Sequence, residues 1–82
     1  MMSYCRFGRD SDVYIYSNGS YLVCESCKLK GGKSFATKRR SRMMTHVEEH
    51  VSRGHKVPQS TIDELTIEFI LDDDIVSIKR MN

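Results

Sequence analysis

The sequence predicts a small α+β domain, and three features carry the prediction. Two strand-like runs flank Asn18-Gly19, a Cys-x2-Cys pair stands at Cys24 and Cys27, and a helical stripe downstream carries two histidines. We expect a β-hairpin packed on a long helix, as in a ββα zinc finger, and then a C-terminal helix or strand.

The size of the chain favours a metal-stabilised fold. Its 82 residues suit a single domain over 1–82, with a core over about 4–70 and an acidic, frayed tail over 72–82. A hydrophobic content of 39% without tryptophan is too high for a disordered chain but small for a packed core. Domains of this size often depend on a metal or on disulfides, because the core alone contributes only a few kcal/mol.

The hairpin is predicted from two β-branched and aromatic runs. Residues 13–16 and 21–23 favour strands, and Asn18-Gly19 between them tolerates the positive φ of a type I′ turn. The hairpin is expected over about residues 12–24, so that its second strand leads into the Cys-x2-Cys pair. A short extended segment is expected before it, over residues 3–7.

A long helix is predicted between Thr37 and Gly54, after a brief strand over residues 34–36. Thr37 is a suitable N-cap, and Gly54 is a suitable C′ residue because glycine adopts the left-handed conformation that ends helices. Apolar residues and histidines recur between them at i, i+3, i+4, i+7 and i+8, which is one helical face. The members of this stripe are Met43, His46, Val47, His50 and Val51.

The chain beyond the linker at Pro58 is open to two interpretations. Ser60 or Thr61, each followed three residues later by an acidic residue, resembles a capping box, and the apolar residues that follow have helical spacing. The alternation that begins at Thr66 is instead typical of a strand, so residues 66–71 are left open between the two. Residues 75–78 are expected to form a short edge strand or a frayed end.

Four residues have the ligand order of a tetrahedral zinc site, with two thiolates from a turn and two imidazoles from one helical face. They are Cys24, Cys27, His46 and His50. The 18 residues between the two pairs exceed the usual spacing of a finger by about six, and they include a glycine-containing loop where insertions cost little. Structural zinc is therefore the expected cofactor, in a C2H2-like site.

Two further residues remain alternatives as ligands. His55 follows His50 at an allowed spacing, and Cys5 would replace a histidine if the N-terminal segment folded back over the cysteine pair.

Residues 46–50 also match the His-x-x-Glu-His pattern of inverted zinc peptidases. Catalysis needs an open coordination position, which two cysteine ligands would close, so no enzymatic activity is expected.

The formal charge of +2 hides a basic middle and an acidic end. Residues 28–42 contain seven basic residues and no acidic one, and residues 63–74 contain six acidic residues and no basic one. Cations at a helix start oppose the macrodipole, which hints at a role other than local stability. Nucleic-acid binding, to DNA or RNA, is the first expected function, through Lys38, Arg39, Arg40 and Arg42.

A protein-interaction module is the alternative function. A single finger reads only about 3 bp and rarely binds alone, and the acidic end would repel a phosphate backbone. The acidic tract is expected to dock on the basic helix of its own chain or of a second copy, which would make the protein a monomer or a weak dimer.

A cytoplasmic location without a membrane partner is expected. The chain has no apolar run near the roughly 18 residues of a membrane span, and its first residues lack the apolar segment of a signal peptide. In a reducing compartment, two thiols at this spacing favour metal ligation over a disulfide.

Several segments together resemble a family of small uncharacterised actinobacterial and actinophage proteins with a C2H2-like zinc-binding motif. The similar segments are residues 4–7, 10–16, the Cys24-x2-Cys27 pair, and the stretch from His46 through His50, Gly54 and His55 to Pro58. The resemblance covers about residues 4–65. It implies a phage or prophage product in a bacterial cytoplasm, where such proteins often bind host nucleic acid or a host protein.

Overall fold

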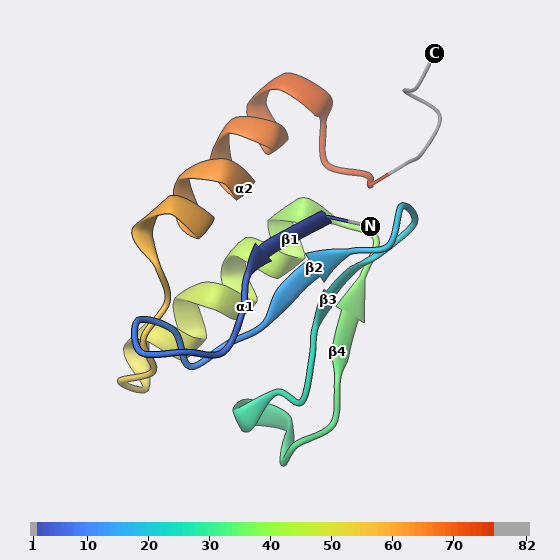
Figure 1. The fold of residues 1–82 in the computed structure, drawn as a ribbon. Coiled ribbons are helices and arrows are strands. Elements are labelled where there is room, and N and C mark those ends of the chain that lie inside the picture. Colours follow the sequence, from blue (N-terminus) through green and yellow to red (C-terminus); the bar gives the residue numbers. More distant parts are fainter. Residues whose placement is uncertain (1, 77–82) are drawn as a thin grey trace.

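The computed structural model describes residues 2–76 as one antiparallel sheet and two α-helices (Figure 1). The four strands pair in chain order, β1-β2-β3-β4. The elements are β1 (Met2–Cys5), β2 (Ile15–Ser17), β3 (Leu22–Cys24), the 3-10 turn η1 (Lys28–Lys30), β4 (Phe35–Thr37), α1 (Arg40–Ser52) and α2 (Gln59–Asp72). The expected α+β class is confirmed, and the sheet is two strands wider than the hairpin alone.

Both helices lie on the same side of the sheet, and the core lies between them and the strands (Figure 1). Side chains alternate across a strand, so the inward residues of β2 and β3 meet the helices while their neighbours face outward. The fully buried members of this core include Ile15, Leu22, Cys24, Met43, Val47 and Leu65. Neither α1 nor α2, the two helices within residues 2–76, covers the opposite face of the sheet (Figure 1).

The predicted hairpin forms, but its turn differs from the expected one. Ser17 pairs with Leu22, so four residues connect the strands instead of two. Gly19 has a φ of 96°, whereas Asn18 is not at positive φ, as a type I′ turn would require. The Asn18 side chain instead accepts hydrogen bonds from the backbone N–H groups of Ser20 and Tyr21, at 3.0 and 2.9 Å. A side-chain cap therefore replaces the two-residue turn.

Helix α1 begins at Arg40, two residues later than a Thr37 N-cap would place it. Thr37 ends β4, and its hydroxyl accepts from the Arg39 N–H at 3.1 Å. The first N–H groups of the helix are bonded by Asp74: its backbone oxygen accepts from Arg40 at 2.7 Å and its carboxylate from Ser41 at 2.8 Å. The cap comes from a residue distant in sequence, which local pattern cannot indicate.

The other end of α1 confirms Gly54 as the C′ residue. Gly54 has a φ of 87° and its N–H donates to Val51 O at 3.0 Å, while His55 N–H donates to His50 O at 2.9 Å. These two bonds form a Schellman motif. Val51 itself is 49% exposed, so the expected inward stripe ends at His50.

Gly54→Ala is expected to lower the free energy of unfolding by about 1–2 kcal/mol, because a Cβ is strained at positive φ even where it meets no neighbour. Gly8→Ala is the matched control: its φ lies outside that region, and the nearest atom to the new Cβ is 4.0 Å away. Urea unfolding of both variants at one free zinc concentration measures the difference. Equal losses would contradict the assigned role of Gly54.

Residues 66–71 are helical, which settles the alternative left open by the sequence. Pro58 is the N-cap of α2, without a side-chain cap, and both expected capping residues, Ser60 and Thr61, lie inside the helix. Thr61 is fully buried and donates its hydroxyl to Tyr4 O at 3.1 Å. Beyond α2, Ile75 makes an isolated bridge to Arg39. Residues 77 and 78, part of the expected C-terminal strand, lie outside the described residues.

Within residues 2–76, no helix has the length and apolar character that crossing a membrane requires.

Candidate metal centre

Two cysteines and two histidines meet between the sheet and α1. They are Cys24, Cys27, His46 and His50, all buried, with their ligand atoms within 4.8 Å of one another. Cys27 Sγ lies 3.3 Å from His46 Nε2 and 3.4 Å from His50 Nε2, and Cys24 Sγ lies 3.6 Å from His50 Nε2. A tetrahedral zinc with ordinary bond lengths separates sulfur and nitrogen ligands by about 3.5 Å. The four residues are therefore close enough to coordinate a metal ion, and the spacing is compatible with zinc.

The cysteine pair is positioned by a tight turn at the end of β3. Ser26, between the two cysteines, has a φ of 49°, in the left-handed region that reverses the chain. The Cys27 N–H donates to Lys33 O at 3.0 Å, and Cys27 O accepts from the N–H groups of Lys30 and Gly32 at 3.0 and 2.9 Å. These bonds fix Cys27 beside Cys24, the last residue of β3.

The long spacer has a structural use. The residues in excess of a standard finger form η1 and β4, and β4 adds to the sheet beside β3. Phe35, the first residue of β4, stacks on the His46 ring with centroids 4.1 Å apart and planes inclined by 12°. Met43 is fully buried in the core, and Phe35 packs against that core.

His50 is supported on both of its ring nitrogens. Nε2 faces the two thiols, and Nδ1 lies 2.8 Å from His55 Nδ1, which the Schellman motif places there. Metal-bound histidines generally use the second ring nitrogen in such a hydrogen bond, which fixes the tautomer. His55 therefore contacts a member of the cluster and is not itself among the four converging residues.

Burial sets the protonation states in the cluster. It lowers the pKa of His50 to about 4, with His46 and His55 adding to the effect, and it lowers the pKa of His46, with Lys30 adding to it. Burial also raises the pKa of Cys24, and the neighbouring Cys27 adds to the rise. The imidazoles are thus neutral, as metal binding requires, whereas the Cys24 thiolate needs a nearby cation to be stable.

The other proposed ligand, Cys5, is not brought into the cluster. It is half-buried at the end of β1, and its thiol lies 3.6 Å from Val13 O. The register of β1 shifts between Ser3 and Cys5, and in this stretch the Tyr4 ring is buried toward the helices.

The four basic residues expected to bind nucleic acid have different surroundings. Arg40 is buried and donates to the backbone oxygens of Asp73 and Ile75 at 2.8 and 3.2 Å. Arg39 pairs with the Asp74 carboxylate at 2.9 Å. The acidic end of the chain therefore docks on the start of α1, one of the arrangements that the sequence predicts.

Lys38 and Arg42 remain exposed. The Lys38 ammonium lies 5.4 Å from the centre of the Tyr21 ring. Arg42 borders a shallow polar hollow beside the metal cluster, with Lys30 and Glu49 also on its rim. Of the four cations, Arg40 is thus buried, Arg39 is exposed but paired with Asp74, and the other two lie on the surface.

Comparisons with protein-family models, with curated proteins and with solved structures find no match to this chain.

Proposed function

We propose that this chain is a non-enzymatic protein-interaction module whose fold depends on one structural zinc ion. Four buried protein ligands are typical of structural zinc sites, whereas catalytic sites keep a position for water or substrate. Zinc binds well to a set of two thiolates and two imidazoles, whereas hard cations such as Mg²⁺ and Ca²⁺ prefer oxygen ligands.

The peptidase-like pattern over residues 46–50 has a simpler explanation. Glu49, which would activate water in such an enzyme, is exposed and pairs with Arg53 of the next turn at 3.5 Å. Glu48 is exposed as well. Both glutamates are exposed, and the two cysteines would complete the coordination of a bound ion.

The observation that carries the proposed function is the bare apolar face of α2. Ile67, Ile70 and Leu71, at i, i+3 and i+4, are 53%, 70% and 75% exposed. Together they expose on the order of 400 Å² of mostly apolar surface, a patch size that often marks an interaction site on a monomer. This helix faces Arg40, Tyr4 and the core with its other side, so the patch does not contribute to the internal packing.

A groove between α1 and α2 borders this patch. It encloses about 210 Å³, and its lining is apolar apart from Glu48 and Thr66. The apolar lining residues are Met44, Val47, Val51, Ile62 and Leu65. Ile70 lies one turn beyond Thr66 on the same side of α2, so the groove and the patch form one surface.

The charge of α2 indicates the partner. Residues Gln59–Asp72 contain four acidic residues and no basic one. An amphipathic helix with apolar anchors and a basic rim matches both the groove and this charge. The resemblance to actinophage proteins implies that the partner belongs to a bacterial host.

Ile70→Glu is expected to weaken binding of a designed leucine–lysine amphipathic peptide by at least tenfold, because it places a charge in the apolar contact. Phe7→Glu, at a 47% exposed ring away from α2, is the control and should leave the affinity unchanged. Calorimetric titration measures both. An unaltered affinity of Ile70→Glu, or no binding by the wild type, would refute the assignment of this surface.

A second copy of the chain is the competing occupant. Sedimentation velocity distinguishes it: a wild-type dimer that Ile70→Glu converts to a monomer would show self-association in place of the proposed partner.

Nucleic-acid binding is a second candidate function. The start of α1 gives it little support, because two of its four cations are paired with acidic groups. The observation that favours it is a group of aromatic rings and cations on the sheet.

A further inference from the structure

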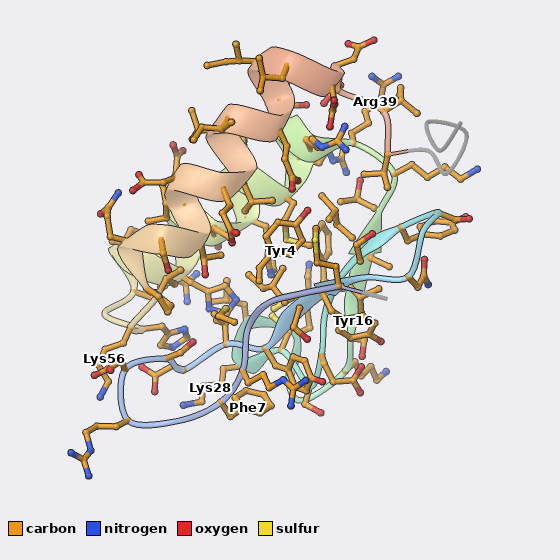
Figure 2. The ribbon with its side chains drawn as sticks, turned by 45° about the horizontal axis from the view of Figure 1, so that its top comes forward. Tyr4, Phe7, Tyr16, Lys28, Arg39 and Lys56 are labelled. Carbon is orange, nitrogen blue, oxygen red and sulfur yellow. The ribbon has the colours of Figure 1, made fainter. Side chains whose placement is uncertain are left out.

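The face of the sheet opposite the helices carries a row of aromatic side chains. Val13 and Ile15 are fully buried, so Tyr14, just before β2, and Tyr16, within it, project to the other side of the sheet. The rings of Phe7 and Tyr14 are 5.8 Å apart at 89°, and those of Tyr14 and Tyr16 are 5.6 Å apart at 63°. Figure 2 shows Phe7 and Tyr16 on the side of the strands away from α2, whereas Tyr4 points toward that helix.

A cation accompanies the aromatic side chains at each end of this face. The Arg6 guanidinium lies 6.0 Å from the centre of the Tyr14 ring. At the other end, Lys38 lies 5.4 Å from the centre of the Tyr21 ring, which precedes the buried Leu22 and so projects outward. Neither Arg6 nor Lys38 has a carboxylate within ion-pair distance among the described residues.

These rings are held in place and are open to solvent to different degrees. Phe7 is 47% exposed and Tyr21 is 40% exposed, whereas Tyr14 and Tyr16 are half-buried, so each ring keeps part of its surface free. The Tyr16 hydroxyl donates to Glu25 Oε1 at 3.1 Å, and edge contacts fix Tyr14 between its two neighbours. Rings that are already ordered lose little conformational entropy when a ligand stacks on them.

We propose that this open face binds single-stranded nucleic acid. Unpaired bases stack on the rings of Phe7, Tyr14, Tyr16 and Tyr21, and Arg6 and Lys38 contact the backbone phosphates. An antiparallel sheet with exposed aromatic side chains and nearby cations supplies both interactions, whereas a duplex keeps its base faces stacked and out of reach. The site is distinct from the groove and patch of α2, which lie on the other side of the sheet.

The test uses the zinc-bound full chain and fluorescein-labelled oligonucleotides, as single strands of mixed-sequence DNA and RNA and as the DNA duplex. Fluorescence anisotropy at low salt is expected to show single strands bound at least tenfold more tightly than the duplex. Phe7→Leu combined with Tyr14→Leu keeps apolar bulk but removes two rings, and is expected to weaken single-strand binding about tenfold or more. Arg6→Gln should weaken it and reduce the slope of log affinity against log salt by about one.

Phe69→Leu is the matched control, since Phe69 is a 38% exposed ring on α2, and it should leave the affinity unchanged. Circular dichroism and zinc content show whether each variant is folded, and Phe7→Leu alone replaces the double variant if that one is not. The proposal would be overturned by no binding of single strands at low salt, by equal binding of the duplex, or by full binding of single strands to folded ring variants. A proline-rich peptide is the competitor for this face. If it displaces the single strand and binds more tightly than the strand does, the face would be assigned to a protein ligand and the proposal would also be overturned.

Discussion

Cys24→Ser is expected to abolish the cooperative fold of this chain. Structural zinc in finger peptides has an apparent binding free energy of about 10–16 kcal/mol, which is similar to or greater than the whole stability of a typical domain. A serine hydroxyl is a poor zinc ligand, so the variant would lose the metal ion that the fully buried Cys24 thiol is expected to bind. Circular dichroism and the dispersion of amide NMR resonances should both show an unfolded chain at neutral pH.

Cys5→Ser is the matched control for this prediction. Its thiol is half-buried and outside the cluster, so this variant should keep a cooperative thermal transition and its metal. A folded Cys24→Ser protein with a normal transition would contradict a structural role for the metal.

The second large effect is expected at Arg40, with a loss of about 3 kcal/mol in Arg40→Ala. The guanidinium is buried between the two helices, with Nε 3.6 Å from the Glu68 carboxylate, an ion-pair rather than a hydrogen-bond distance. It also donates to the backbone oxygens of Asp73 and Ile75. Tyr4 donates its hydroxyl to the same carboxylate, so removal of the arginine leaves several polar groups without their main partner.

Arg42→Ala, two residues further along α1, is the control. Arg42 is exposed, so its loss should change the free energy of unfolding by less than about 0.5 kcal/mol. Urea unfolding of the two variants separates a structural arginine from a surface one. Equal stability of Arg40→Ala and Arg42→Ala would contradict the role assigned to Arg40.

The parts of this fold that the sequence predicts are those that depend on local chemistry. The cysteine pair and the two histidines one helical turn apart predict a cluster that the structure then brings together. Gly54 is recognisable as a helix end because glycine alone adopts its φ without strain. The strand pairing around residues 18–21 follows from the residue types that flank the turn.

The parts that the sequence does not predict depend on residues distant in the chain. Asp74 caps α1 and pairs with Arg39, and these contacts lower the pKa of the Asp74 carboxyl group. The Ser41 N–H is the largest contributor to that shift.

Thr37 is not the N-cap because β4 extends through it, and Val51 is exposed because α2 leaves a groove beside it. Periodicity gives the side of a helix that carries apolar residues, but not which of them a second helix covers.

Two contacts of the clustered histidines could not be predicted from the spacing of residues along the sequence alone. Phe35 stacks on His46 across the loop, and His55 reaches the second nitrogen of His50 through the Schellman turn. A signal for His55 existed in the glycine before it, since a Schellman motif folds the next residue back over the last helical turn.

The metal content of the untagged protein tests the central claim most directly. We expect elemental analysis of protein purified without a histidine tag to find one zinc per chain, bound at the cluster of Cys24, Cys27, His46 and His50. Folded protein with far less than one equivalent of zinc or any other transition metal would contradict the claim that a metal ion holds this domain together.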